Sequence, residues 1–468
     1  MKSHVASCGD LCRLDGLISL KGLDRVAELD LLADLIAAAH RAGADSADAL
    51  YVESAAVSVA ERLGRPEKLE REESRDLGLR VLIGHRQAVV SSTDLGRSAL
   101  DALVERAVAM ARAVPEDPYC GLADQSELAR EIPELDSVDP TEPSTEVLSE
   151  RAKAAEESAR SVPGITNSEG AEASWSRGRV WLAASNGFSG SYAMTRHGVS
   201  VSVLAGSGVG MERDYDFSSA VHGSDLEDPV AVGRRAGERA VKRLNPRKAA
   251  TTQAPVIYDP RVAGSMLGHL AGAINGSSVA RGTSFLKDRL GQGIFPLGVN
   301  VVDDPHRRRG LRSKPFDGEG VANRARKLID DGVLTTWLLD LRSARQLGLA
   351  STGHASRGTG GPPGPAPTNL WLEPGHVTAT ELIGDVVQGL YITELIGFGV
   401  NGITGDYSRG AAGFWIEAGA LAYPVSEVTV AGNLNDMFAK LTPANDLTFR
   451  TGMDAPTIRI EGMTIAGR

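Results

Sequence analysis

Cysteine is scarce in this chain, whose 468 residues include only Cys8, Cys12 and Cys120. A sparse, odd set of cysteines provides no disulfide framework and is typical of a reducing compartment. Cys8 and Cys12 could form half of a metal clip, but no second Cys or His pair lies near them in the sequence to complete it. The cysteines therefore predict neither a disulfide scaffold nor a structural zinc site.

Long apolar runs and an excess of positive charge are also absent. The opening stretch MKSHVASCGDLCRLDG has no apolar core of signal-peptide length, and no run approaches the roughly 18 apolar residues of a membrane span. The formal net charge of −10 argues against a general nucleic-acid binder, which needs a positive face to neutralise phosphates. We expect a cytoplasmic protein with no membrane and no nucleic-acid partner.

Aromatic residues are few, at 5%, whereas the 53 glycines predict many turns and close backbone approaches. With 42% hydrophobic and 24% charged residues, the composition excludes wholesale disorder. A chain of this length is too long for one core and suits two or three domains. We expect a flexible lead-in over residues 1–20, a mixed α/β domain over 21–248, and a β-rich domain over 249–468.

The first half mixes helix and strand patterns. Apolar residues recur at helical spacing over 23–43, 95–114, 145–161 and 228–244. Strand patterns cover 48–60, 77–92 and 179–205, with turns expected near Gly84-His85, at Asn186-Gly187 and at His197-Gly198. Residues 67–75 could be a strand edge or a loop. The acidic, proline-rich stretch 115–143 is expected to be a surface connector.

The second half has strand patterns without alternating helices. Short strands are predicted at 254–258, 298–302, 325–330, 333–339, 425–431 and 456–461. Residues 351–368, STGHASRGTGGPPGPAPT, are expected to form a long irregular loop of functional kind. The fold class predicted is therefore α+β, with an N-terminal mixed α/β domain and a C-terminal antiparallel, barrel-like β domain.

Few local signatures of catalysis are present. The sequence has no G-x-S-x-G elbow, no Walker A sequence and no H-E-x-x-H zinc motif. His269 stands alone at helical spacing, so a structural role is favoured over a ligand role. The cluster 303–309, DDPHRRR, is interpreted as a solvated turn with an anion-attracting face rather than as a catalytic cluster.

Two glycine-containing stretches are more specific. In Gly397–Gly410, GFGVNGITGDYSRG, four glycines precede an acceptor, an aromatic ring, a hydroxyl and a guanidinium that can grip a peptide carboxylate or carbonyl. The alternative is a set of glycine-rich turns with an internal Asp–Arg pair. Arg281-Gly282-Thr283-Ser284 could likewise be a hydrogen-bonding rim, or a turn whose hydroxyls cap the chain.

Several uncommon motifs occur in an order that resembles one family. They are VARGTSFLKDRL (279–290), PFDGEG (315–320), GHASR (353–357), TNL (368–370) and the run 393–437, which includes TELIGFGVNGITGDYSRGAAGFWIEAG and AGNLNDMF. Together they resemble the TldE (PmbA) branch of the TldD/TldE proteins, over most of the second half and more loosely over the first.

The resemblance implies a heteromeric cytoplasmic zinc protease that trims or degrades unfolded peptides. In such an assembly the TldD-like subunit carries zinc through H-E-x-x-x-H and a later cysteine. Aligning the shared Gly282–Ser284 places that motif on Leu267, Gly268 and Gly272 of this chain, and no cysteine follows Cys120. We therefore expect no zinc in this chain and zinc in its partner subunit.

Three hypotheses follow from these patterns. The first is a non-catalytic subunit that closes the chamber and binds peptide through Arg281, Thr283, Ser284, Asp406, Tyr407, Ser408 and Arg409. The second is a regulatory protein-binding factor without a peptidase role, as the family's association with DNA gyrase suggests. The third is hydrolysis by this chain alone through groups such as His306 or His354. In isolation we expect a symmetric homodimer.

Overall fold

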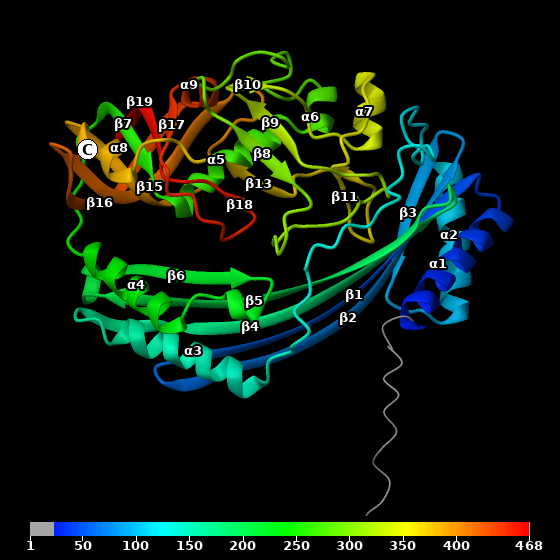
Figure 1. Ribbon diagram of the computed structural model, residues 1–468, viewed down its shortest axis with the longest axis horizontal. Helices are drawn as coiled ribbons and strands as arrows, with labels where there is room; N and C mark the ends of the chain where they lie inside the picture. The colour runs from blue at the N-terminus through cyan, green and yellow to red at the C-terminus, as the bar shows by residue number, and fades with distance from the viewer. Residues whose placement is uncertain (1–22, 468) are drawn as a thin grey trace, which may run out of the picture.

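The computed structural model describes residues 23–467, which fold as two sheet-based halves (Figure 1). The predictions made for the lead-in 1–20 and for Cys8 and Cys12 lie outside the described residues. The α+β class is confirmed, with a mixed N-terminal half and a barrel-like C-terminal half. No helix within residues 23–467 is long and apolar enough to cross a membrane.

A six-stranded antiparallel sheet forms the first half, in the order β3-β2-β1-β4-β5-β6. The strands are β1 (Ser46–Arg62), β2 (Arg65–Ile83), β3 (Arg86–Ser92), β4 (Ile165–Ala184), β5 (Ser189–Ala205) and β6 (Glu212–Ala220). Residues 67–75, left open between strand and loop, belong to β2, and the turn at Gly84-His85 is confirmed.

The prediction of a turn at His197-Gly198 is wrong, because strand β5 continues through both residues. Gly198 pairs with Ser174 of β4 on one side and with Ser219 of β6 on the other. A Cβ at Gly198 would lie 2.9 Å from the Ser174 hydroxyl oxygen. The glycine therefore relieves crowding inside a sheet rather than making a turn.

Four helices cover one face of this sheet in two separate pairs, as Figure 1 shows. They are α1 (Leu23–Arg41) and α2 (Arg97–Ala113) at one end, and α3 (Thr145–Arg160) and α4 (Pro229–Lys242) at the other. Trp181 lies in the hydrophobic cluster beneath the first pair and Trp175 in the cluster beneath the second. Since side chains alternate along a strand, Arg177 and Arg179 lie on this same face between the two tryptophans.

The second half contains a closed barrel. Its strands are β7 (Thr252–Tyr258), β14 (Gln388–Ile396), β15 (Asp406–Glu417), β16 (Ala420–Asn433) and β19 (Ile458–Ala466), and pairing of β16 with β19 closes it. Its pairs are antiparallel apart from β7 with β14. Strand β17 (Leu441–Pro443) pairs with β19 outside the ring.

A smaller sheet lies beside the barrel in the order β10-β9-β8-β13-β18. Its strands are β8 (Val301–Asp304), β9 (Arg326–Asp330), β10 (Val333–Leu334), β13 (Asn369–Leu372) and β18 (Met453–Asp454). The remaining elements are the helices α5 (Pro260–Ala273), α6 (Gly276–Ala280), α7 (Leu341–Leu347), α8 (Ala379–Gly384) and α9 (Leu434–Ala439), and the short 3-10 helices Gly208–Gly210 and Gly223–Asp225. Helix α5 contacts β7 and β14 of the barrel and also β13 and β18, so it joins the two sheets.

The long loop expected at 351–368 is irregular over most of its length, and it packs against the first sheet. It contains the two-stranded pair β11 (Ala355–Ser356) and β12 (Gly364–Pro365). Beyond β11, Arg357 Nη1 donates to Asp48 Oδ1 of β1 at 2.6 Å. A Cβ at Gly78 of β2 would lie 2.2 Å from the Thr359 carbonyl oxygen, so only glycine permits this approach. Backbone contact with the first sheet orders this loop.

Charged side chains are buried at the seam where the two halves meet. Arg80 of β2 binds Asp48 through Nε at 2.8 Å and lies 3.7 Å from Glu319 Oε1. These side chains and Arg357 are 3–4% exposed. Burial alone would raise the pKa of Asp48, but Arg357 and Arg80 outweigh burial and hold that pKa below its ordinary value. Burial raises the pKa of Glu319 to about 8.

The cluster 303–309, interpreted from sequence as a solvated turn, is largely structural. Asp303 is fully buried, accepts from Thr368 N at 2.7 Å and pairs with His354 Nε2 at 3.2 Å. Arg309 Nε donates to Asp136 Oδ2 at 2.6 Å and so fastens this segment to the connector 115–143. The solvated-turn interpretation is therefore wrong for Asp303, whose carboxylate organises the neighbouring strand ends.

Candidate functional site

The candidate site is built on helix α5. Asp259 caps the helix by accepting from Arg261 N at 3.0 Å, and Pro260 occupies its first turn. One face is buried in the core through residues such as Leu267 and Leu270. On another face the small residues Gly264, Gly268 and Gly272 recur every four positions, which places them in one row.

This glycine row is closed at one end and open at the other. A Cβ at Gly264 would lie 2.7 Å from the Met453 carbonyl oxygen of β18, whereas Gly268 would meet only the Met453 Cε, at 3.8 Å. A Cβ at Gly272 would have no heavy atom within 4 Å. Gly268 and Gly272 are exposed, so the helix offers bare backbone to a ligand here.

The residues at the expected zinc-ligand positions do not fit a metal. Leu267 is 3% exposed and belongs to the hydrophobic core, while Gly268 and Gly272 have no side chains. Zinc in proteins takes thiolate, imidazole or carboxylate ligands, none of which these positions provide. Among residues 23–467, no group of three or more His, Cys, Asp or Glu residues could hold a metal ion.

His269 is the imidazole nearest to these positions in the sequence, and it lies beside Tyr407 and Arg409. Its ring stands edge-on to Tyr407, with ring centroids 5.7 Å apart and planes at 78°. Burial, and then the Arg409 guanidinium, lower the pKa of His269 to about 4. The imidazole is therefore neutral at physiological pH and a weak base. In the described chain its buried Nε2 has no hydrogen-bond partner.

The stretch 281–284 follows the short helix α6, and its two hydroxyls are used within the fold. Ser284 is 3% exposed, with Oγ donating to Ala273 O at 2.5 Å and accepting from Leu286 N at 3.0 Å. Thr283 Oγ1 donates to Ser278 O at 3.2 Å. Arg281 and Thr283 are exposed and remain accessible, whereas Ser284 is not.

The four predicted residues of β15 divide between its two sides, because strand side chains alternate. Tyr407, 1% exposed, and Arg409 lie on the side that faces His269. Asp406 and Ser408 are exposed on the other side. The structure therefore brings Tyr407 and Arg409 together with His269, and separates Asp406 and Ser408 from them.

The internal Asp406–Arg409 pair considered from sequence does not form, because each side chain has other partners. Asp406 accepts from Thr404 Oγ1 at 2.6 Å and from Asn433 Nδ2 at 3.1 Å, and these bonds lower its pKa. Arg409 Nε donates to the Ile396 carbonyl oxygen at 3.3 Å. Asp406 thus anchors the preceding loop, and Arg409 turns toward α5.

The loop 397–405, the first part of the Gly397–Gly410 stretch, contacts the segment that follows Arg281–Ser284. Phe285 N donates to Gly402 O at 3.1 Å, which places the segment after Ser284 against this loop. Gly399 approaches the backbone so closely that a Cβ would lie 2.0 Å from the Ser408 carbonyl oxygen. The glycines therefore bring two chain segments together, as close backbone approach requires.

Sequence reasoning missed the exposed apolar side chains of this loop and of Ile396, the last residue of β14. Phe398 is 98% exposed, and Ile396 and Ile403 are each 59% exposed. The Arg409 guanidinium carbon lies 5.8 Å from the centre of the Phe398 ring. A bulky apolar residue flanked by Gly397 and Gly399 was the signal available in the sequence. This combination of an exposed ring, a guanidinium and bare helix backbone suits ligand binding rather than bond cleavage.

Three models of one family match successive parts of the chain. They are PmbA/TldA metallopeptidase domain 1 over residues 47–111, the central domain over 138–244, and the C-terminal domain over 251–467. The third of these contains the entire candidate site.

Individual relatives match nearly the full length. The metalloprotease PmbA of Escherichia coli O157:H7 is 41% identical over 427 residues, covering 91% of this chain and 93% of the relative. A PmbA homolog of Haemophilus influenzae is 36% identical over 433 residues, covering 92% and 94% respectively.

Solved structures share the fold. A crystal structure of a proposed modulator of DNA gyrase from Bacteroides thetaiotaomicron has a TM-score of 0.87 at 26% identity, covering 94% of this chain and 98% of that one. The structure of TldE from Thermococcus kodakarensis has a TM-score of 0.84 at 20% identity, covering 93% of this chain and 100% of that one. With the matches of the domain models and the full-length relatives, these findings show that the chain belongs to the PmbA/TldD/TldE metallopeptidase family.

Proposed function

We propose that this chain is a metal-free, non-catalytic subunit of a TldD/TldE-type heteromeric zinc protease. Its role is to bind unfolded peptides and to help close the chamber in which a TldD-like, zinc-bearing subunit cleaves them in the cytoplasm. One observation carries the proposal: at the zinc-ligand positions, Leu267 lies in the core and Gly268 and Gly272 have no side chains. Zinc hydrolysis needs ligands for the ion and a base to activate water, and these three positions supply neither.

The open glycine row supports a peptide-binding role. An extended peptide is held through its backbone with loose sequence preference, and it needs close approach to a surface without side chains in the way. Gly268 and Gly272 offer such a surface, Arg409 can bind a carbonyl or carboxylate, and Phe398 offers an exposed apolar face. Arg281, Thr283, Asp406 and Ser408 are further exposed candidates, whereas Ser284 and Tyr407 act through the local fold.

The test compares zinc content and unfolded-peptide cleavage for the chain alone and for the chain co-expressed with a zinc-bearing paralogue. We expect the isolated chain, a symmetric homodimer in this proposal, to be metal-free and inert, and the pair to be zinc-loaded and active. Stoichiometric zinc with cleavage by the isolated chain would overturn the proposal.

A matched pair of variants tests the binding site. Arg409→Ala should raise the KM of the paired enzyme for peptide several-fold, because the guanidinium contacts substrate. The control Arg324→Ala removes an exposed arginine elsewhere in the same half and should leave KM unchanged. Equal KM values in the two variants would remove Arg409 from the binding site.

A second candidate function follows from the Bacteroides thetaiotaomicron structure, which is described as a proposed modulator of DNA gyrase. Under this alternative the chain is a regulatory protein-binding factor without a peptidase role. Co-purification with gyrase, and never with a zinc-bearing paralogue, would favour it over the subunit proposal.

A further inference from the structure

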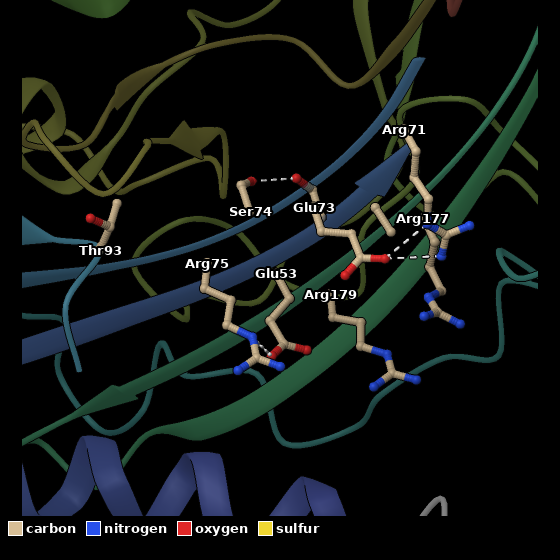
Figure 2. Close-up of a pocket in the computed structure, with 10 residues that line it drawn as sticks. Glu53, Arg71, Glu73, Ser74, Arg75, Thr93, Arg177 and Arg179 are labelled. Carbon is tan, nitrogen blue, oxygen red and sulfur yellow. Dashed lines mark hydrogen bonds and ion pairs between the residues drawn. The ribbon is translucent and has the colours of Figure 1, made fainter. Parts of the chain in front are cut away.

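The face of the N-terminal sheet that carries the helices has an uncovered trough between the two helix pairs. Its floor is Ala55 of β1, which pairs with Glu73 of β2 on one side and with Arg177 of β4 on the other. One step along the strands, Glu53 pairs with both Arg75 and Arg179. Figure 2 shows Glu53, Glu73, Arg75, Arg177 and Arg179 pointing to one side of the sheet, whereas Ser74 points to the other. The trough has a volume of about 510 Å³.

Arginines outnumber carboxylates in this trough. Among residues 23–467, the lining includes Arg71, Arg75, Arg177 and Arg179 against two acidic side chains, Glu53 and Glu73, and a third carboxylate, Glu142, binds Arg71 at its edge. This local excess stands out on a chain whose formal net charge is −10. An anion entering the trough would therefore be attracted by the local field although the whole chain repels it.

The two β4 arginines are the ones available to a ligand. Glu53 is committed to Arg75 at 3.2 Å and accepts from the Tyr51 hydroxyl at 2.9 Å, while Glu73 binds Arg71 Nη2 at 2.9 Å. Within residues 23–467, neither Arg177 nor Arg179 forms an ion pair with a carboxylate. Both are half-buried, and Arg177 lies 5.8 Å from the centre of the Trp175 ring.

The spacing of these arginines matches an extended polypeptide. Arg177 and Arg179 are two residues apart on one strand face, so their Cα atoms are separated by about 6.6 Å. Alternate side chains of an extended peptide have the same separation. The molecule provides a precedent, because Glu142 of the acidic connector already binds Arg71 Nη1 at 3.0 Å at this trough. The lining contains no aromatic residue on which a nucleobase could stack.

We propose that this trough binds an acidic segment of a partner polypeptide in extended conformation, with carboxylates at alternate positions paired to Arg177 and Arg179. The site is separate from the candidate peptide site on α5, because it lies on the sheet face that carries the four helices and not on the face that meets the C-terminal half.

The experiment measures fluorescence anisotropy of a labelled ten-residue peptide of alternating Glu and Ser, titrated with the full chain. The test variant is Arg177→Glu/Arg179→Glu. The control Arg234→Glu/Arg324→Glu makes the same change in net charge at two other exposed arginines. A milder Arg177→Gln/Arg179→Gln variant serves as a second test, and thermal unfolding verifies that each variant is folded.

We expect Arg177→Glu/Arg179→Glu to weaken peptide binding at least tenfold and Arg177→Gln/Arg179→Gln to weaken it less. The control variant should bind the peptide like the parent chain. Binding should also weaken steeply with salt, since exposed charges are screened. Equal binding by the trough and control variants would overturn the proposal, as would equal binding of a Gln/Ser peptide. Tighter binding of a single-stranded oligonucleotide, lost in the trough variant, would also overturn it by assigning the trough to nucleic acid.

Discussion

Two charged clusters lie on opposite faces of the same strands, and they differ in burial. At the seam, Asp48 of β1 is the cross-strand partner of Arg80 of β2, with both side chains 3–4% exposed. In the trough, Glu53 of β1 is the cross-strand partner of Arg75 of β2, and these side chains are 22% and 69% exposed. Two directly opposed pairs on the same two strands thus differ in their access to water, because they point to opposite faces of the sheet.

This difference in burial determines whether each ion pair contributes to stability or to recognition. A buried ion pair loses hydration on both partners, so removing one partner leaves a charge with neither water nor a counter-ion. An exposed pair keeps most of its hydration and contributes little to stability, but it remains free to exchange partners. The seam pair therefore presents buried charges to the second half, where Arg357 binds Asp48 and Glu319 lies beside Arg80, and the trough charges are available for recognition.

The largest expected effect is at the seam. Arg80→Met removes one of the two cations that bind the buried Asp48 carboxylate and leaves it with only Arg357, which should lower the free energy of unfolding by about 3–5 kcal/mol. Urea denaturation monitored by tryptophan fluorescence measures this loss. A loss under about 1 kcal/mol would mean that the seam charges act no differently from surface charges.

The second largest expected effect is that titration of Glu319, at the same seam, makes the free energy of unfolding depend on pH. Burial raises the pKa of Glu319 to about 8, so the folded chain holds this proton where the unfolded chain, at about 4.3, has released it. The stabilisation that comes from protonated Glu319 is complete below the pKa of this residue in the unfolded chain. It is lost as the pH rises through about 8, its pKa in the folded chain. Glu319→Gln should therefore gain stability relative to the parent chain between pH 5 and pH 9, by about 1.4 kcal/mol per unit of pKa shift removed.

Urea titrations at pH 5, 7 and 9 measure this difference. Glu72→Gln controls for the loss of one negative charge at an exposed position on the first sheet. A constant stability difference between Glu319→Gln and the parent chain across this range would contradict a raised pKa at Glu319.

Sequence patterns predicted the strands of both clusters but not their environments. Alternation over 48–60 and the turn near Gly84-His85 were confirmed as β1 and the β2–β3 hairpin, because these signals are local. No local signal showed that Asp48 would be buried and Glu53 exposed. That difference depends on the 355–359 segment, about 300 residues further along the chain, whose Arg357 docks on one face only.

The candidate site shows the same limit. The glycine-rich stretch was recognisable, and Arg409 does lie beside the helix that carries Gly268 and Gly272. However, grouping Asp406 with Arg409 ignored that the stretch becomes a strand from Asp406 onward, which sends alternate side chains to opposite sides. Ser284 was chosen for its hydroxyl, yet that hydroxyl bonds the Ala273 carbonyl left free at the end of α5.

The smallest expected effect on stability is in the trough, at the exposed pair of Glu53 and Arg75. Arg75→Met removes the cation of the exposed cross-strand pair while Glu53 keeps its hydrogen bond from the Tyr51 hydroxyl. The free energy of unfolding should fall by about 0–1 kcal/mol, and by less in 0.5 M salt because the pair is exposed and screened. The measurement is the same urea titration used for Arg80→Met, at low and high salt. A loss of about 3 kcal/mol that salt does not reduce would show that burial is not what separates the two clusters, since the exposed pair would then contribute as much as the buried one.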